Sequence, residues 1–294
     1  MKKLFWIALF SFSLLLTGCS SSNKNQVTIG GKNFSEQDIL VEILKQTIEG
    51  NSDIKVVPKA FLGGTSVVAA ALDKGDLDIY VEYTGTALLH ILKEPLETDP
   101  DKAYKIVKEG YKAKKNILWL NQLGFNNTYA ITMRASQAEQ LKIKTISDLV
   151  PYAPKFSIAS DAEFAERPDG LQGMEKAYNI KFSKASSMDA GLMYGAIQDN
   201  QVDTIAAFAT DGRIPAFKLK VLTDDKHFFP PYQAAPIIRT DTLTKYPQLE
   251  GILNKLSGKL TDQEMASLNA QVDLDKKSPK EVAEKWLKTQ GIIK

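Results

Sequence analysis

The sequence contains few of the residues from which enzymes and metal centres are usually built. Its 294 residues include one cysteine and two histidines. A single cysteine excludes a disulfide within the chain, and a zinc site of the histidine and cysteine type has no support. No serine lies in the G-x-S-x-G pattern of a nucleophile elbow. We therefore expect no catalytic activity, no metal and no cofactor.

A surplus of positive charge is also missing. The chain carries 37 basic and 35 acidic residues, and without residues 1–18 it would lose two lysines and carry 35 of each sign. Nucleic acids and anionic lipids attract proteins through a basic surplus. We therefore expect neither to be a main partner.

Apolar runs are short, and the most pronounced one, at residues 4–16, follows two lysines. It is too short to span a bilayer and is typical of a secretory signal peptide. Leu-Thr-Gly-Cys at residues 16–19 then resembles the lipobox of bacterial lipoproteins, whose cysteine is diacylated. We expect lipid on Cys19 to anchor the protein to a bacterial cell membrane, facing the extracytoplasmic side, with residues 19–26 as a polar tether. A plain signal peptide with an incidental cysteine is the alternative.

Short apolar strands alternate with helical patterns along the rest of the chain. Such strands are expected at residues 27–30, 54–57, 79–81, 156–159, 181–183 and 204–208. Helical patterns separate the first three strands, and this order predicts a parallel sheet with right-handed crossovers. The same alternation restarts in the second half of the chain, which predicts two α/β lobes.

Residues with capping side chains mark several predicted helix starts. Asp99 precedes Pro100 at the start of a helical pattern that runs to about Lys115. Capping signatures, in which a serine or threonine is followed three residues later by an acidic residue, begin at Ser35, Thr261 and Ser278. We expect the two C-terminal helices that follow the last two signatures to pack on the first lobe.

Two stretches of the sequence end in the same way. Residues 76–86 and 201–212 each lead through an aspartate into a short apolar strand, then an aromatic residue, a threonine and a glycine. Ligands of open α/β sheets bind beyond the carboxyl ends of strands, so Tyr83 and Phe208 are predicted to face each other across a cleft. Strand alternation puts Tyr80 on the opposite face from Tyr83, where packing in the core is favoured.

Further aromatic residues, Tyr129, Phe164 and Tyr232, lie near other predicted strand ends and crossings. A quaternary ammonium has no N–H group to donate, and aromatic ring faces hold it with roughly 0.5–2 kcal/mol per contact. We hypothesise that rings from two lobes enclose such a cation, with simple core packing as the alternative. The Gly-Gly-Thr at residues 63–65 could offer N–H groups to a ligand carboxylate at a helix start, or be an ordinary turn.

Six motifs then occur in a fixed order along the chain. They are GKNFSEQ at residues 31–37, LGGT at 62–65, DIYVEYTGT at 78–86, GFNNTYA at 124–130, TDGRI at 210–214 and FPPY at 229–232. Together they resemble the substrate-binding lipoproteins of osmoprotectant ABC importers, which take up glycine betaine, choline and carnitine. The resemblance covers nearly all of the chain after the tether. It implies a monomer that hands a small solute to a membrane permease powered by a cytoplasmic ATPase.

The resemblance also implies a two-lobed type II periplasmic-binding-protein fold, each lobe a mostly parallel sheet flanked by helices. We expect a signal peptide at residues 1–18, lobe I at residues 27–126 and 231–294, and lobe II at residues 127–230. Two chain crossings, near Asn126 and Pro231, would be the hinges around which the lobes close on the solute.

The resemblance assigns a cage ring to Tyr83 and polar contacts with the other end of the ligand to Gln37 and Thr65. Lys32 and Arg167 are candidate partners of a carboxylate, with solvated surface charge as the alternative. The full expected ligand-binding set is Lys32, Asn33, Gln37, Gly64, Thr65, Tyr83, Thr84, Asn127, Tyr129, Phe164, Arg167, Phe208 and Asp211.

Two departures from the family pattern leave the identity of the solute open. Phe208 stands where family members carry a tyrosine, and Ser186 where some choline binders place another cage ring. Carnitine, or ergothioneine as a trimethylammonium amino acid, would suit a thinner cage. Two other functions are weighed against solute import: a lipoprotein hydrolase, which the residue content disfavours, and a chemosensory co-receptor with the same fold.

Overall fold

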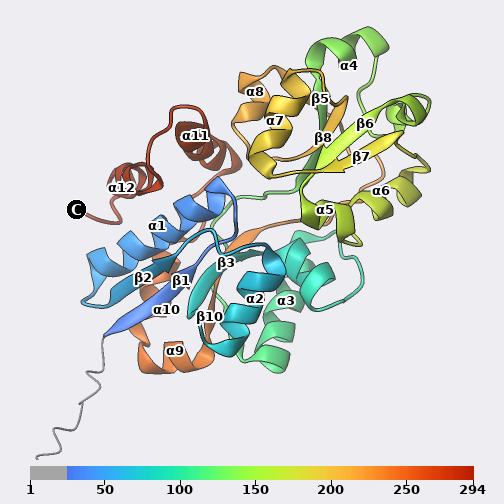
Figure 1. The fold of residues 1–294 in the computed structure, drawn as a ribbon. Helices are drawn as coiled ribbons and strands as arrows, with labels where there is room; N and C mark the ends of the chain where they lie inside the picture. The colour runs from blue at the N-terminus through green and yellow to red at the C-terminus, as the bar shows by residue number, and fades with distance from the viewer. Residues whose placement is uncertain (1–24) are drawn as a thin grey trace, which may run out of the picture.

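The computed structural model describes residues 25–294, and the predicted signal peptide and Cys19 lie outside the described residues. Within this part of the chain two five-stranded sheets form, in the orders β2-β1-β3-β10-β4 and β7-β6-β8-β5-β9. Helices flank both sheets, and each sheet with its helices forms a separate lobe (Figure 1). The predicted two-lobed α/β architecture is confirmed. We call the lobe with the first sheet lobe I and the other lobe II.

The sheet of lobe I mixes parallel and antiparallel strands. Its strands are β1 (Gln26–Gly30), β2 (Lys55–Lys59), β3 (Ile79–Tyr83), β4 (Ile117–Trp119) and β10 (Ala234–Arg239). β1 pairs in parallel with β2 and β3, as predicted. β10 returns from the far end of the chain and lies antiparallel between β3 and β4.

The sheet of lobe II has the same mixed character. Its strands are β5 (Tyr129–Arg134), β6 (Ser157–Ser160), β7 (Lys184–Ser187), β8 (Thr204–Phe208) and β9 (Leu219–Val221). β6 is parallel to β7 and β8, while β5 is antiparallel to β8 and β9. The strand expected near residues 181–183 begins three residues later, at Lys184. Phe182 donates its N–H to the Glu175 side chain at 3.1 Å and Ser183 donates to the carbonyl of Ala153 at 3.0 Å, so pairing with β6 begins only at Lys184.

Helices cover the faces of the two sheets. They are α1 (Ser35–Asn51), α2 (Thr65–Lys74), α3 (Pro100–Lys115), α4 (Ala135–Leu141), α5 (Ala162–Glu166), α6 (Leu171–Tyr178), α7 (Ala190–Gln198), α8 (Arg213–Ala216), α9 (Thr240–Lys245), α10 (Gln248–Leu253), α11 (Asp262–Asp273) and α12 (Pro279–Thr289). A π-helical turn, Thr86–Ile91, follows β3. Within residues 25–294, no helix combines the length and apolarity that a membrane span needs.

Most of the predicted helix starts are confirmed. The Asp99 side chain accepts from the N–H of Lys102 at 2.9 Å, and Thr261 and Ser278 each form a reciprocal capping box. The start at Ser35 is different. The N-cap residue of α1 is Phe34, whose side chain has no hydrogen-bond acceptor, so Ser35 is the first residue of the helix and no side chain caps it. The Ser35 hydroxyl donates to Asp273 at the end of α11 at 2.5 Å.

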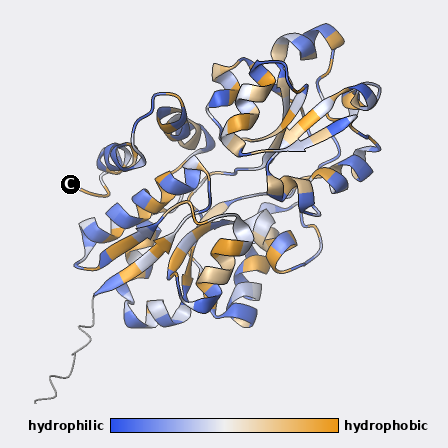
Figure 2. Cartoon of the chain, viewed as in Figure 1, coloured by the Kyte–Doolittle hydropathy of each residue, from blue (hydrophilic) through white to orange (hydrophobic). Residues whose placement is uncertain are grey.

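The two C-terminal helices pack on α1, as expected for lobe I (Figure 1). Gln46 of α1 donates to the carbonyl of Lys280 at 3.0 Å, and Asn51 donates to that of Ile292 at 3.2 Å. Apolar residues of α12, including Trp286, join the same core cluster as the buried face of α1. Hydrophobic residues gather on the strands of both sheets and hydrophilic residues on the outer helices (Figure 2).

The chain passes between the lobes before β5 and again after β9, and the two passages lie side by side. Asn126 pairs with Gln233 in an antiparallel bridge. The Asn126 side chain also accepts from the N–H of Tyr232 at 2.7 Å. The two passages therefore form one paired connection between the lobes. The lobe boundaries at residues 126/127 and 230/231 stay a prediction.

Candidate ligand-binding pocket

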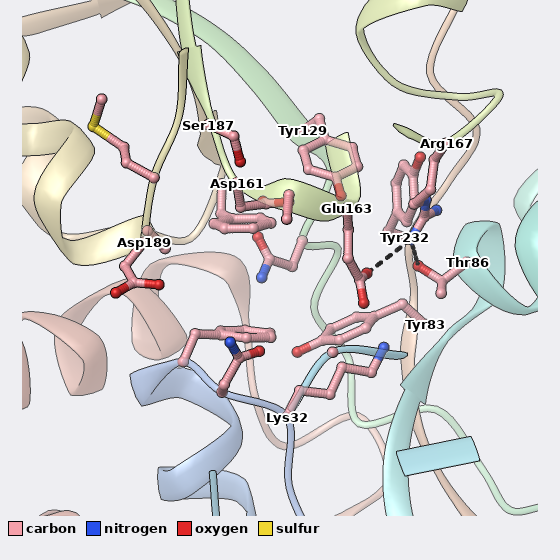
Figure 3. A pocket seen from close by; sticks show the side chains of 18 residues that line it. Lys32, Tyr83, Thr86, Tyr129, Asp161, Glu163, Arg167, Ser187, Asp189 and Tyr232 are labelled. Carbon is pink, nitrogen blue, oxygen red and sulfur yellow. Dashed lines mark hydrogen bonds and ion pairs between the residues drawn. The ribbon is translucent and has the colours of Figure 1, made fainter. Parts of the chain in front are cut away.

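A cavity of about 270 Å³ lies where the strand ends of the two lobes face each other (Figure 3). Lobe I contributes the loop between β1 and α1, the start of α2 and the end of β3. Lobe II contributes the start of β5, the end of β8, helix α5 and the start of α7. A site at the carboxyl ends of strands, between two α/β units, is the usual place for a small ligand.

Five aromatic rings from both lobes form much of the wall: Phe34, Tyr83, Tyr129, Phe208 and Tyr232. Phe34 stacks on Phe208 with ring centres 5.5 Å apart and planes 7° apart, and it lies 6.5 Å from Tyr83. Tyr129 lies 5.4 Å from Phe208 and 5.7 Å from Tyr232. The predicted meeting of Tyr83 and Phe208 at one hollow is therefore found in the structure.

The alternation of β3 places Tyr83 at this wall. Tyr80 faces the opposite side and is fully buried in a separate core cluster. The Tyr83 hydroxyl donates to Oε1 of Glu36 at 2.7 Å and accepts from Nε2 of Gln37 at 3.0 Å. Burial, together with the charge of Glu36, raises the pKa of Tyr83 well above its ordinary value. The ring is thus held neutral and in one orientation, with Gln37 behind it.

Two cationic side chains at the wall are already paired with carboxylates. Nζ of Lys32 lies 2.6 Å from Oε1 of the buried Glu82 and 5.1 Å from the centre of the Tyr83 ring. Arg167 donates from Nε to Asp169 at 2.9 Å, and its Nη2 makes a second, short contact with the same carboxylate. Both cations are therefore oriented by the protein and neutralised by it.

Glu163 of α5 reaches across from lobe II to the start of α2 in lobe I. Oε2 accepts from the Thr65 hydroxyl at 2.9 Å, and Oε1 accepts from the Thr65 N–H. Burial alone would raise the pKa of Glu163, but the charge of Lys32, the two Thr65 hydrogen bonds and Arg167 lower it below the usual value. The anion position expected at residues 63–65 is thus filled by a carboxylate of the protein itself.

Glu36 is a second carboxylate that joins the lobes, and it lies behind the ring wall. Oε1 accepts from Tyr83 and from Nδ2 of Asn127 at 2.8 Å, and Oε2 accepts from Nδ2 of Asn269 at 3.0 Å and from the Thr210 hydroxyl. Burial raises the pKa of Glu36, and the four hydrogen bonds act in the opposite direction. One side chain thereby connects α1, β3, α11 and the end of β8.

Most members of the expected ligand-binding set line the cavity: Lys32, Asn33, Gly64, Tyr83, Asn127, Tyr129, Arg167 and Phe208. The other members lie behind or beside the wall: Gln37, Thr65, Thr84, Phe164 and Asp211. Thr84 donates to the carbonyl of Pro231, Phe164 is fully buried against Tyr129, and Asp211 pairs with Arg213. Which of these residues contact the solute stays a prediction.

Several wall residues were absent from the expected set, namely Phe34, Thr86, Asp161, Glu163, Ser187, Asp189 and Tyr232. Of these, Tyr232 is among the hypothesised cage rings but not in that set. Ser187 lines the cavity, whereas the neighbouring Ser186 does not. A sequence signal existed for some of them. Phe34 lies inside the first of the six motifs, and Asp161 directly follows a strand, at the edge where such sites form.

Two facing α/β lobes with a solute-sized cavity at their strand ends define a type II periplasmic-binding-protein fold. Residues 25–289 match the OpuAC family, described as the substrate binding domain of an ABC-type glycine betaine transport system. The chain belongs to this family, and the resemblance found in the six motifs is confirmed.

Individual relatives agree with this assignment. The chain is 39% identical over 299 residues to the carnitine transport binding protein OpuCC of Listeria monocytogenes serotype 1/2a (strain 10403S), covering 98% of this chain and 97% of the relative. It is 38% identical over 293 residues to the ergothioneine transport permease/ergothioneine binding protein EgtU of Helicobacter pylori (strain G27), covering 97% of this chain and 52% of that protein. A crystal structure of a glycine betaine/carnitine/choline ABC transporter matches with a TM-score of 0.76 and 36% identity, covering 92% of this chain and 99% of the other.

Proposed function

We propose that the protein is an extracytoplasmic substrate-binding protein of an ABC importer that captures a quaternary-ammonium solute of the glycine betaine, choline or carnitine type. The observation that carries the proposal is the wall of five aromatic rings from two lobes around one small cavity. Ring faces attract a methylated ammonium with roughly 0.5–2 kcal/mol each once water is excluded. Membership of the family supports delivery of the solute to a membrane permease driven by an ATPase.

Ergothioneine is a second candidate solute. It carries a trimethylammonium group like the betaines and, in addition, a ring with N–H groups. Oδ2 of Asp161 at the cavity is buried and has no hydrogen-bond partner within residues 25–294, so it could accept from such a group. The similarity to the ergothioneine-binding relative also favours this candidate.

Three further properties belong to the proposal. The protein acts as a monomer without catalytic activity, and its lobes close around the paired passages near Asn126 and Pro231. Lipid on Cys19 anchors it to the cell membrane. The lipobox at residues 16–19 supports the anchor, which mass spectrometry of the N-terminal peptide would test: an unmodified Cys19 in the mature protein would contradict it.

Calorimetry with choline, glycine betaine, carnitine, proline betaine and ergothioneine tests the function. We expect at least one of these solutes to bind the purified protein, and none of them to be chemically altered. Tyr83→Ala should weaken that binding at least about tenfold, because one cage ring contributes up to about 2 kcal/mol. Tyr152→Ala, which removes a lobe II ring outside the cavity wall, is the control and should leave the affinity unchanged. Binding of none of the solutes would refute the proposal.

A further inference from the structure

The charged side chains at the cavity determine which charges a bound solute can carry. A ligand carboxylate could be received in three places: at Lys32, at Arg167 and at the start of α2. Each place already holds a carboxylate of the protein. Glu82 pairs with Lys32, Asp169 pairs with Arg167, and Glu163 binds the start of α2.

Glu163 differs from the other two carboxylates because it lies at the cavity itself. Its side chain is 31% exposed, whereas those of Glu82 and Asp169 are 0% and 1% exposed. Figure 3 shows the Glu163 carboxylate directed at the side of the cavity where Tyr83 and Thr86 lie. It also lies 3.4 Å from Nη1 of Arg167, which donates to the Thr86 hydroxyl at 3.1 Å.

The start of α2 is shaped to accept this carboxylate. A Cβ atom on Gly64 would lie 2.4 Å from Oε1 of Glu163, so the close approach depends on the missing side chain. The N–H and hydroxyl of Thr65 then bind both carboxylate oxygens. Backbone N–H groups at the start of a helix favour an anion. In this protein the anion comes from the opposite lobe.

The remaining charges make the cavity favourable for a cation. Three carboxylates line it, from Asp161, Glu163 and Asp189, against the two paired cations Lys32 and Arg167. Oδ2 of Asp161 has no partner among the described side chains. A zwitterion would bring its own carboxylate into this group of like charges, or would have to displace Glu163 from Thr65.

We propose that Glu163 is a specificity-determining residue that occupies the carboxylate position of the site and selects a quaternary-ammonium cation without a carboxylate over a betaine. A choline-type alcohol fits best, because its hydroxyl can donate to Glu163 or to Asp161 while its ammonium meets the rings. The inference rests on the proposed function and narrows the class of solute that the site takes.

Calorimetry on the full protein with choline and with glycine betaine tests the inference. The wild type should bind choline at least about tenfold more tightly than glycine betaine, since like charges brought together cost more than the equivalent of about 1.4 kcal/mol. Glu163→Gln keeps the shape and removes the charge, and it should reduce this preference at least about tenfold. Glu166→Gln removes the same charge from an exposed position of the same helix and should leave the preference unchanged. Thermal unfolding of each variant checks that it is folded.

Each other result counts against the inference. If the wild type prefers glycine betaine, or if Glu163→Gln changes both affinities by the same factor, Glu163 only holds the lobes together and does not select the solute. The proposed function would stand in that case, because a quaternary ammonium still binds. If neither these two solutes nor the others of the panel bind, the proposed function itself fails, and the inference fails with it.

Discussion

Replacement of Glu36 by alanine should destabilise the protein more than replacement of Glu42, a partly exposed acidic residue of the same helix. Glu36 accepts four hydrogen bonds in a site where its side chain is almost fully buried. One of the four donors keeps another acceptor, because Asn269 also donates to the carbonyl of Thr210 at 2.9 Å. The Tyr83 hydroxyl only accepts from Gln37, so its own proton would have no acceptor. The cost therefore comes mainly from the other three donors.

Those three donors are the Tyr83 hydroxyl, the Asn127 amide and the Thr210 hydroxyl, which the substitution leaves without an acceptor. A buried donor without an acceptor costs about 1–3 kcal/mol. Three such groups give about 3–9 kcal/mol, and removal of the burial penalty of the carboxylate offsets part of this. We therefore expect Glu36→Ala to lower the free energy of unfolding by about 2–5 kcal/mol.

Urea unfolding of the protein without solute measures this loss as a lower midpoint. Glu42→Ala is the matched control, because Glu42 also lies in α1 and pairs with Lys45 near the surface at 3.2 Å. That pair is worth less than about 1 kcal/mol. If Glu36→Ala costs no more than Glu42→Ala, the carboxylate does not hold the two lobes in the way described here.

Three further predictions follow from buried or crowded groups. Burial raises the pKa of Glu36 above its ordinary value of 4.5, so the stability that its proton provides is complete below pH 4.5 and is lost as the pH rises through the folded pKa. The free energy of unfolding of the wild type, measured in urea, should therefore fall relative to that of Glu36→Gln as the pH rises through the folded pKa. A difference between the two proteins that does not change with pH would contradict this. Gly64→Ala should push Glu163 off α2 and, in calorimetry, move the choline preference in the direction of Glu163→Gln; an unchanged preference would argue against the contact. Asp169→Ala should lower the free energy of unfolding, measured in urea, by about 3–5 kcal/mol, because the buried Arg167 loses its closest carboxylate and keeps only the 3.4 Å contact with Glu163; a cost below about 1 kcal/mol would contradict that pairing.

Local patterns predicted the parts of the fold that depend on local physics. The alternation of strands and helices predicted two lobes, and the capping boxes at Thr261 and Ser278 lie where the residue types indicate. Pairing between distant segments carries no such local signal. β10 joins the sheet of lobe I through Ala234, which pairs with Tyr83. The periodicity of neither segment indicates that the other is its pairing partner. The cap expected at Ser35 was wrong because α1 begins one residue earlier than expected, with Phe34 at the N-cap position.

The candidate site divides in a similar way. The rings at strand ends were predictable, because strand ends are identifiable and alternation assigns Tyr83 to one face and Tyr80 to the other. Phe34, in the loop between β1 and α1, was not predicted. The carboxylates were not. An acidic residue in a helical pattern usually faces solvent, and Glu36 becomes a buried acceptor only when Asn269, 233 residues away, is folded against it. Glu163 likewise acquires its role from Thr65 in the opposite lobe.

The central claim is that ring faces hold the positive charge of a methylated ammonium between two lobes. The most direct measurement compares, by calorimetry, choline with its uncharged isostere in which a carbon atom replaces the nitrogen. The two molecules have nearly the same shape and the same hydroxyl. We predict that choline binds at least about tenfold more tightly, because the attraction of several rings depends on the charge. Equal affinities would mean that the cavity recognises only shape and apolar surface, and would contradict the account.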